Sequence, residues 1–223
     1  MGAALINNVL FDLDGTLADT APDLALALNR LLKENAKPPM PFTTIRPMVS
    51  HGGIHMIARA FAMSENDPEF NTLRERFLSL YASSLAEETR LFPGIAELLD
   101  QLEAEGCTWG IVTNKFERLT FPLLEALGLH KRAACVVCGD TLSWSKPHPA
   151  PMLHACKLVD REPAHSLYIG DAEKDVIAGK SANMYTLVAR YGYLADEDTP
   201  EHWGADGMID SPAEIMGWLT EQR

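Results

Sequence analysis

Short apolar runs alternate with amphipathic segments along most of the chain. The runs have the length of strands, whereas the segments between them repeat their apolar residues at the three-to-four spacing of a helix. Such alternation is typical of a parallel sheet covered by helices on both faces. The expected strands are Leu5–Phe11, Thr108–Val112, Ala134–Val137, Ser166–Ile169, Tyr185–Ala189 and Gly207–Ile209, and the expected helices are Gly94–Glu105, Phe116–Leu127, Pro151–Leu158 and Asp175–Asn183.

Residues 19 to 88 interrupt this alternation. They contain helical patterns over 23–32, 54–61 and 73–85 and no convincing strand, and four prolines between 38 and 47 mark the loops that separate these patterns. We therefore predict an α/β fold with a doubly wound parallel sheet, formed by residues 1–18 and 89–223. Residues 19–88 are expected to be a helical insertion after the first strand.

Two carboxylates, Asp12 and Asp14, follow the first expected strand and precede Gly15-Thr16. A side-chain period of two places both on one side while the chain stays extended. Two anions so close repel unless a cation or a proton lies between them. Because ligands of an open parallel sheet bind outside the carboxyl ends of its strands, the residues after the other strands should converge on this pair. These residues are Thr113-Asn114, Gly170-Asp171 and, in a later loop, Lys146.

Asp171 and Asp175 are four residues apart. A helix that begins near Ala172 would carry Asp175 beside Asp171, at the end where the helix dipole favours acids. Simple helix capping is the alternative explanation for Asp175. Together with Asp12 and Asp14, however, the pair would gather four carboxylates around one point. Oxygen ligands select a hard divalent cation, so we predict Mg²⁺ as the cofactor.

A carboxylate cluster with Mg²⁺, a hydroxyl and a lysine suits phosphoryl transfer. Asp12 would attack phosphorus and form an aspartyl phosphate. Asp14 would protonate the leaving oxygen and then take a proton from water. Thr113 would donate its hydroxyl to a phosphoryl oxygen, and Lys146 would supply a positive charge. To substrate binding we assign Gly15, Thr16, Asn114 and Lys115, together with His51, His55 and Arg59 from the insertion.

The three residues from the insertion are spaced by four and would share a face if one helix held them all. The pair Gly52-Gly53 favours a helix that begins only at Ile54. Our hypothesis is that Arg59 or His55 meets a carboxylate of the organic group. The alternative is that these side chains are simply solvated.

Four groups of residues, taken in order and spacing, resemble the motifs of the haloacid dehalogenase superfamily over nearly the whole chain. They are Asp12-Leu13-Asp14-Gly15-Thr16, Thr113-Asn114, Lys146-Pro147, and Gly170-Asp171 with Asp175. The resemblance implies a Rossmann-like core with a helical cap and a Mg²⁺ site. It also implies that Asp12 and Asp171 are metal ligands, that Asp14 contributes its backbone carbonyl, and that Asp175 closes the site.

Within the superfamily the chain resembles the phosphoglycolate phosphatase group and, more closely, bacterial N-acetylmuramic acid 6-phosphate phosphatases of peptidoglycan recycling. The likeness is carried by Asp19-Thr20 with Asp23, Ser50-His51-Gly52-Gly53, Leu91-Phe92-Pro93-Gly94, Thr113-Asn114-Lys115 and Gly139-Asp140-Thr141-Leu142. Two segments depart from the usual pattern and could reshape the pocket rim, namely Ser143-Trp144-Ser145 and Ala172-Glu173-Lys174. We expect a phosphomonoester hydrolase that acts on a small carboxylated or sugar phosphate, with N-acetylmuramic acid 6-phosphate favoured.

Three other activities stay open at this point: a phosphoglycolate phosphatase, a phosphomutase and a non-catalytic phosphate-binding module. A dehalogenase that attacks carbon is disfavoured, because enzymes of that kind in the superfamily lack an acid at the position of Asp14. A mutase would retain that acid. A binding module would be favoured only if a catalytic group were missing.

The composition of the chain limits the kinds of binding partner that we expect. The formal net charge of −12 argues against broad binding to nucleic acid or to an anionic membrane. No run approaches the length of a membrane span, and the N-terminus is a poor signal peptide, so we expect a cytoplasmic protein, monomeric or homodimeric. Cys135 and Cys138 have the spacing of a redox or zinc pair, but residues three apart on a strand point to opposite faces.

Overall fold

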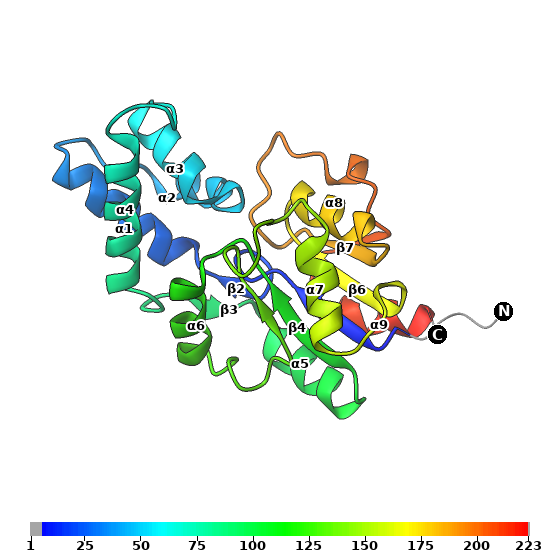
Figure 1. Ribbon diagram of the computed structural model, residues 1–223. Helices are drawn as coiled ribbons and strands as arrows, with labels where there is room; N and C mark the ends of the chain where they lie inside the picture. The colour runs from blue at the N-terminus through cyan, green and yellow to red at the C-terminus, as the bar shows by residue number, and fades with distance from the viewer. Residues whose placement is uncertain (1–5, 223) are drawn as a thin grey trace.

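The sheet sets the architecture of the protein, which we describe from a computed structural model over residues 6–222. Its six strands are parallel and follow the order β5-β4-β1-β6-β7-β8 (Figure 1). Strand β1 is central, and the chain leaves it first toward β4 and β5 and later returns to β6 on its other side. The strands are β1 (Asn8–Phe11), β4 (Thr108–Val112), β5 (Val136–Val137), β6 (Ser166–Gly170), β7 (Tyr185–Ala189) and β8 (Gly207–Ile209).

The predicted α/β class with a doubly wound sheet is confirmed. Every expected strand is present, although β1 begins only at Asn8 and Leu5 lies outside the described residues. The Cys135 strand is reduced to two residues. The expected helices of this part of the chain are also present, as α5 (Ile95–Ala104), α6 (Glu117–Ala126), α7 (Ala150–Leu158) and α8 (Glu173–Ser181), with α9 (Glu214–Glu221) added at the end.

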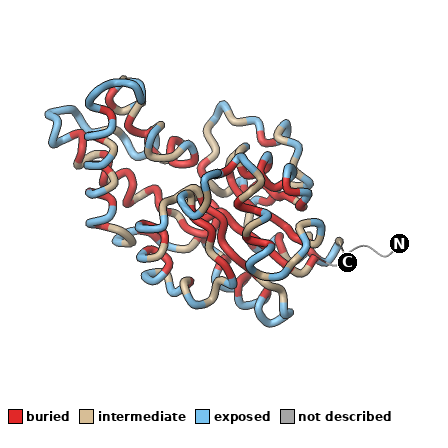
Figure 2. The backbone as a smooth tube through the Cα atoms, viewed as in Figure 1, coloured by how far each residue is buried: buried red, intermediate tan, exposed pale blue. Residues whose placement is uncertain are grey.

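Helices cover both faces of the sheet because successive strand residues point to opposite sides. Leu10 packs with α7 and α8 on one face. Val9 and Phe11 pack with α5, α6 and α9 on the other. Figure 2 shows the strands as a buried band enclosed by helices whose outer sides are exposed.

The residues between β2 (Ala18–Asp19) and β3 (Arg90–Leu91) form what we call the helical insertion, which lies beyond one end of the sheet (Figure 1). Strands β2 and β3 pair antiparallel at its base, a two-residue ladder too short to leave a periodic signal in the sequence. Inside the insertion, α1 packs along α4. Its helices are α1 (Ala21–Glu34), α2 (Phe42–Ile45), the 3-10 helix η1 (Arg46–His51), α3 (Gly52–Phe61) and α4 (Phe70–Ser83); short 3-10 turns η2 (Pro163–His165) and η3 (Pro200–His202) lie elsewhere.

One helix start was predicted wrongly. Helix α3 begins at Gly52 and not at Ile54. The first amides of a helix have no partner inside it, so glycine costs little at this end compared with the helix interior. His51 therefore stands immediately before α3, and His55 lies one turn into it.

The cysteines are all free thiols. Cys135 packs among the buried residues under α7 and α8, and burial raises the pKa of its thiol to about 12. Among residues 6–222, the acidic cluster described below is the one group of His, Cys, Asp or Glu side chains placed to share a metal ion, and neither Cys135 nor Cys138 belongs to it. A zinc or redox role for this pair has no support. No helix within the same residues has both the length and the apolar character needed to cross a bilayer.

The packing of the central strand β1 against the helices can be tested by substitution. Replacing Leu10, which has no exposed surface, by alanine should lower the free energy of unfolding by about 2–5 kcal/mol, through lost apolar burial and an unfilled cavity. The matched control is Leu158→Ala at the end of α7, where the side chain is 54% exposed and the change should stay within about 0.5 kcal/mol. Urea unfolding measures both. Equal effects of the two substitutions would contradict the assignment of Leu10 to the core.

Candidate active site

Three carboxylates converge where the strands end. Asp12 follows β1, and Asp171 follows β6, the parallel neighbour of β1 in register. Asp175 lies in the first turn of α8. Side-chain oxygens from these three residues lie within 4.8 Å of one another, and all three residues are buried. The structure therefore brings together three of the four acids that the sequence placed around one point.

Lys146 supplies the positive charge inside this cluster. Its Nζ lies 2.9 Å from Asp12 Oδ1 and 2.7 Å from Asp175 Oδ1, and it donates to the Tyr168 hydroxyl at 2.8 Å. The Lys146 side chain has no exposed surface. The charges of Asp12 and Asp175 raise its pKa although burial acts in the opposite direction. Lys146 is therefore a fixed cation.

Asn114 holds the loop that carries Lys146. Its Nδ2 donates to the Lys146 carbonyl at 2.9 Å, and its Oδ1 accepts the Lys146 N–H at 3.0 Å. Both ends of the amide are thus used on the backbone of one residue. We assigned Asn114 to substrate binding; it braces the lysine loop and also lines the cavity described below.

The electrostatics of the cluster call for a further cation. Burial, followed by the charges of Asp175 and Asp12, raises the pKa of Asp171 to about 7. Burial also raises the pKa of Asp12, although Lys146 opposes this. One ammonium cannot balance three ionised carboxylates. A divalent cation with oxygen ligands would balance them, so these residues fit Mg²⁺.

Asp175 serves as a helix cap and as a member of the cluster. Its Oδ2 accepts the Ala172 N–H at 3.0 Å, and its Oδ1 accepts from Lys146. The capping bond that the sequence offered as one explanation is therefore present, and the same carboxylate also belongs to the acidic cluster. The capping bond to Oδ2 fixes the orientation of the carboxylate, and Oδ1 is left to contact Lys146.

Gly15 and Thr16 pack against Asp171. A Cβ on Gly15 would lie 2.2 Å from Asp171 Oδ2, and the Gly15 φ of +84° is itself in the left-handed region. Glycine is needed here for both reasons. The hydroxyl of Thr16 donates to Asp171 Oδ1 at 3.5 Å. We assigned both residues to substrate binding, but neither is among the residues that line the cavity beside the cluster.

The side chain of Asp14 stands apart from the three clustered acids. Its Oδ1 accepts from Lys115 Nζ at 2.8 Å and from the Thr20 hydroxyl at 2.5 Å. The Lys115 side chain is only 6% exposed, so this ion pair is largely shielded from solvent. Lys115, which we assigned to substrate binding, thus forms an ion pair with Asp14.

A cavity of about 320 Å³ lies between the strand ends and the helical insertion. Asp12, Asp14, Thr113 and Lys115 line its floor. The hydroxyl of Thr113 accepts the Lys115 N–H at 3.2 Å, which leaves its proton free to be donated. The walls combine apolar and basic side chains. The apolar ones are Leu24, Val49, Ile54, Met56, Phe77, Leu78, Tyr81, Phe116 and Leu119, and the basic ones are Arg74, Lys174 and His51.

The helical insertion is bonded directly to the cluster. The Ser50 hydroxyl donates to Asp171 Oδ2 at 2.8 Å, and Lys174 Nζ donates to the Ser50 carbonyl. Lys174 belongs to one of the two segments in which the sequence departs from the usual pattern. The departure therefore places a cation at the junction between the insertion and the sheet.

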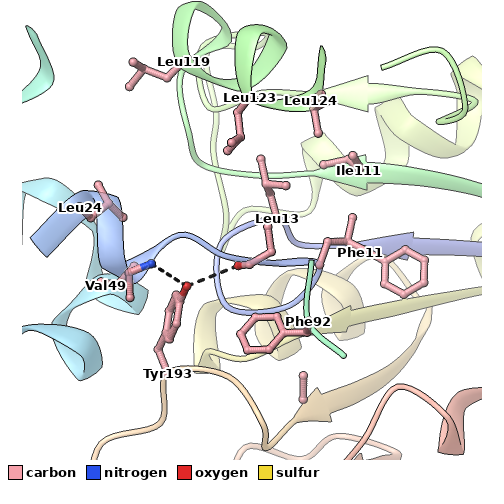
Figure 3. Packing of buried hydrophobic residues seen from close by; sticks show 14 of the residues in the cluster. Phe11, Leu13, Leu24, Val49, Phe92, Ile111, Leu119, Leu123, Leu124 and Tyr193 are labelled. Atoms are coloured by element: carbon pink, nitrogen blue, oxygen red, sulfur yellow. Dashed lines mark hydrogen bonds between the residues drawn. The ribbon is translucent and has the colours of Figure 1, made fainter. Parts of the chain in front are cut away.

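Tyr193 is a functional residue that sequence reasoning missed. Its backbone N–H donates to Asp171 Oδ2 at 2.9 Å, and its hydroxyl accepts the N–H groups of Thr20 and Ala21 at 2.6 and 3.0 Å. Figure 3 shows the ring reaching toward the start of the helical insertion, with its hydroxyl bonded on both sides. Tyr193 lies beyond the residues that directly follow β7 (Tyr185–Ala189), so the rule about strand ends that located Asp12 does not single it out. Tyr168, which accepts from Lys146, and Tyr81, which lines the cavity, lie inside β6 and α4, where no strand end or motif marks them in the sequence.

The three insertion residues expected at the substrate are only partly brought together. The rings of His51 and His55 lie 4.8 Å apart. His51 lines the cavity above the cluster, while His55 lines a second cavity next to it with Glu173, Asp198 and Trp203. Partial burial and the nearby charges of His51 and Arg59 lower the pKa of His55. Arg59 is exposed and lines neither cavity.

Comparison with known proteins agrees with this geometry. Residues 9–189 match the haloacid dehalogenase-like hydrolase family. An N-acetylmuramic acid 6-phosphate phosphatase of Pseudomonas putida is 42% identical over 207 residues, which cover 93% of each chain. A phosphoglycolate phosphatase of Xanthomonas campestris pv. campestris is 40% identical over 207 residues, again 93% of each chain.

A solved structure has a fold similar to that of this chain. The crystal structure of a predicted phosphoglycolate phosphatase from Haemophilus somnus 129PT has a TM-score of 0.86 at 29% identity and covers 97% of this chain and 99% of its own. The likeness thus extends over the sheet and the helical insertion together. Because the family match spans most of the chain and includes all three clustered acids, the protein belongs to the haloacid dehalogenase-like hydrolases, among relatives that are phosphatases.

Proposed function

We propose that this protein is a Mg²⁺-dependent phosphomonoester hydrolase that works through an aspartyl phosphate on Asp12 and acts on N-acetylmuramic acid 6-phosphate. The observation that carries the proposal is the buried cluster of Asp12, Asp171 and Asp175 with Lys146, next to a cavity that Asp12 lines and whose walls are apolar and basic. Relatives at 42% and 41% identity are named for that substrate.

Asp12, Asp171 and the backbone carbonyl of Asp14 would hold the cation, with Asp175 closing the site. Bound there, Mg²⁺ would neutralise the repulsion between the carboxylates and a phosphate dianion. The raised pKa of Asp171 supports this assignment, because a proton or a metal ion relieves the same repulsion.

The chain's own groups account for the transfer. A carboxylate oxygen of Asp12 attacks phosphorus, and the bond from phosphorus to the leaving oxygen breaks with its electron pair going to that oxygen. Lys146, 2.9 Å from Asp12, orients the nucleophile and offers its charge to the phosphoryl group. Thr113 lines the same floor and donates its hydroxyl to a phosphoryl oxygen.

Asp14 is the general acid and then the general base of the proposed reaction. It lines the cavity beside Asp12 without belonging to the acidic cluster, so it can carry a proton to the leaving oxygen. The carboxylate that remains then takes a proton from the water that hydrolyses the aspartyl phosphate. One residue thus serves both half-reactions.

The helical insertion, which we assign to residues 19–88, is proposed to act as a cap that sets specificity. The cavity of about 320 Å³ is larger than a two-carbon phosphate requires, and its apolar wall suits the methyl groups of acetyl and lactyl substituents. Arg74, Lys174 and His51 line it and can meet a carboxylate, a task for which Arg59 is less well placed. Phosphoglycolate is the second candidate, supported by the relative at 40% identity.

Removing the nucleophile tests the chemical assignment. Asp12→Asn should lower kcat by at least about 10³-fold, since an amide cannot form the acyl phosphate, while circular dichroism and Tm stay close to wild type. Phosphate release from p-nitrophenyl phosphate measures the rate. Turnover within about tenfold of wild type would remove Asp12 as the nucleophile.

The stabilisation of the fold by Mg²⁺ should increase with pH. The pKa of Asp171 is raised to about 7, so between about pH 4 and pH 7 the fold retains a proton that the unfolded chain has lost, and stability in EDTA falls as pH rises through this window. Mg²⁺ replaces that proton. The gain in Tm from 5 mM Mg²⁺ over EDTA should therefore be larger at about pH 8 than at about pH 6. A gain that is equal at both pH values would contradict the proposed site.

Substrate choice is tested by comparing kcat/KM for N-acetylmuramic acid 6-phosphate, 2-phosphoglycolate and glucose 6-phosphate. The first should exceed the other two by about tenfold or more, because only it fills the apolar wall and meets a cation with its carboxylate. A higher value for 2-phosphoglycolate would favour the second candidate. Comparable values for all three would show that the cavity does not select.

A further inference from the structure

Lys115 and Tyr81 approach Asp14 from the two sides of the cavity. Lys115 follows β4 in the sheet domain, whereas Tyr81 lies on α4 of the helical insertion. The Lys115 Nζ is 2.8 Å from Asp14 Oδ1 and 4.7 Å from the centre of the Tyr81 ring. An ammonium at this distance from an aromatic ring is attracted by the ring face. The cation thus bridges a catalytic acid and the insertion.

The backbone of Lys115 is fixed by its own neighbours. Its N–H donates to the Thr113 hydroxyl, and its carbonyl accepts the Gly139 N–H at 2.9 Å. Burial lowers the pKa of the Lys115 ammonium, but the charge of Asp14 outweighs it, so the pKa is raised. Its charge is therefore permanent, and its position leaves little freedom for a substrate contact.

Tyr81 contacts the lysine through its ring. The residue is 1% exposed, and its buried hydroxyl has no hydrogen-bond partner among residues 6–222. The contact of Tyr81 with the lysine that has well-defined geometry is the one through its π face, to which the ring adds bulk. Phenylalanine could supply both, and leucine only the bulk.

The contacts of Asp14 decide which oxygen can carry a proton. Two donors, Lys115 Nζ and the Thr20 hydroxyl, both point at Oδ1. Both donors occupy Oδ1, and within residues 6–222 no hydrogen bond holds Oδ2. Oδ2 is then the oxygen that can serve a leaving group in the cavity that Asp14 lines.

We propose that Lys115, held against the Tyr81 ring of the helical insertion, is a positioning residue that holds Oδ1 of Asp14 and thereby presents Oδ2 to the leaving oxygen. As the bond from phosphorus breaks, the leaving oxygen takes the electron pair and then the proton from Oδ2, and Asp14 becomes a carboxylate facing Lys115. Because Tyr81 comes from the insertion, full alignment requires the insertion to be docked. The inference rests on the proposed function, in particular on Asp14 as the proton carrier.

Leaving groups of different basicity separate this role from a structural one. An alkyl phosphate such as glucose 6-phosphate needs a proton on its departing alkoxide, whereas the phenolate of p-nitrophenyl phosphate leaves without one. Stopped-flow measurement of the nitrophenolate burst reports transfer to Asp12 for the aryl ester. Acid-quenched single turnovers report the same step for the alkyl ester.

Lys115→Met keeps the length of the side chain and removes its charge. It should slow transfer from the alkyl ester by about tenfold or more while changing the aryl burst rate by less than about threefold, with KM for both esters nearly unchanged. Tyr81→Leu should give the same selective loss, and Tyr81→Phe should restore the greater part of the alkyl rate. Arg118→Met is the matched control. Arg118 also pairs with α4 from the sheet domain, through Glu75 at 3.2 Å, but does not contact Asp14, so the ratio of the two rates should stay as in wild type.

The outcomes are distinct. Equal losses on both esters in Lys115→Met, or no loss on either, would overturn the positioning role. Failure of Tyr81→Phe to recover any of the rate lost in Tyr81→Leu would overturn the contact through the ring. A wild-type protein that shows no burst and releases no phosphate from either ester would instead refute the proposed function itself.

Discussion

Repulsion among three buried carboxylates is the constraint on which the rest of the site depends. Asp12, Asp171 and Asp175 share a space less than 5 Å across, and Lys146 is the one ammonium that contacts two of them among the described residues. A fold tolerates such a cluster only if its charge is balanced, and an enzyme can use the imbalance to attract a cation and then a phosphate. Burial first, and then the neighbouring carboxylates, raises the pKa values of Asp12 and Asp171.

The sheet creates the cluster and the backbone preserves it. Strands β1 and β6 are parallel neighbours in register, so Asp12 and Asp171 emerge side by side. Helix α8 then starts close enough to return Asp175 to the same point, where its capping bond to Ala172 fixes it. Gly15 allows the chain after β1 to pass within contact of Asp171, an approach that any side chain would block. Asn114 holds the lysine loop from the neighbouring strand end.

The helical insertion is connected to this centre at several points. Ser50 bonds Asp171, Lys174 bonds the Ser50 carbonyl, and Tyr193 joins the loop after β7 to the first residues of α1 (Figure 3). Lys115 under Tyr81 adds a contact on the side of Asp14. The insertion and the acids at the strand ends are therefore physically coupled. A substrate that alters the position of the insertion alters the surroundings of both Asp171 and Asp14.

The sequence predicted the parts of this arrangement that follow from periodicity and from strand ends. Asp12, Thr113 and Asp171 could be placed because each directly follows an apolar strand. Tyr193 could not be placed in the same way, because three residues separate it from the end of β7. The partners of Lys115 and Asn114 could not be predicted, because the direction in which a loop side chain points depends on contacts with segments far along the chain. The start of α3 and the two-residue strands β2 and β3 were missed for a different reason, since neither two glycines nor two residues carry a period.

The imbalance of charge can be measured directly by titrating the protein with Mn²⁺, as a paramagnetic substitute for Mg²⁺, and counting bound ions by electron paramagnetic resonance. The wild-type protein should bind one ion that Mg²⁺ displaces. Asp171→Asn removes one of the three negative charges without changing the size of the side chain and should weaken that binding by about tenfold or more. Equal affinity in the two proteins, or no displaceable ion in the wild type, would contradict the account.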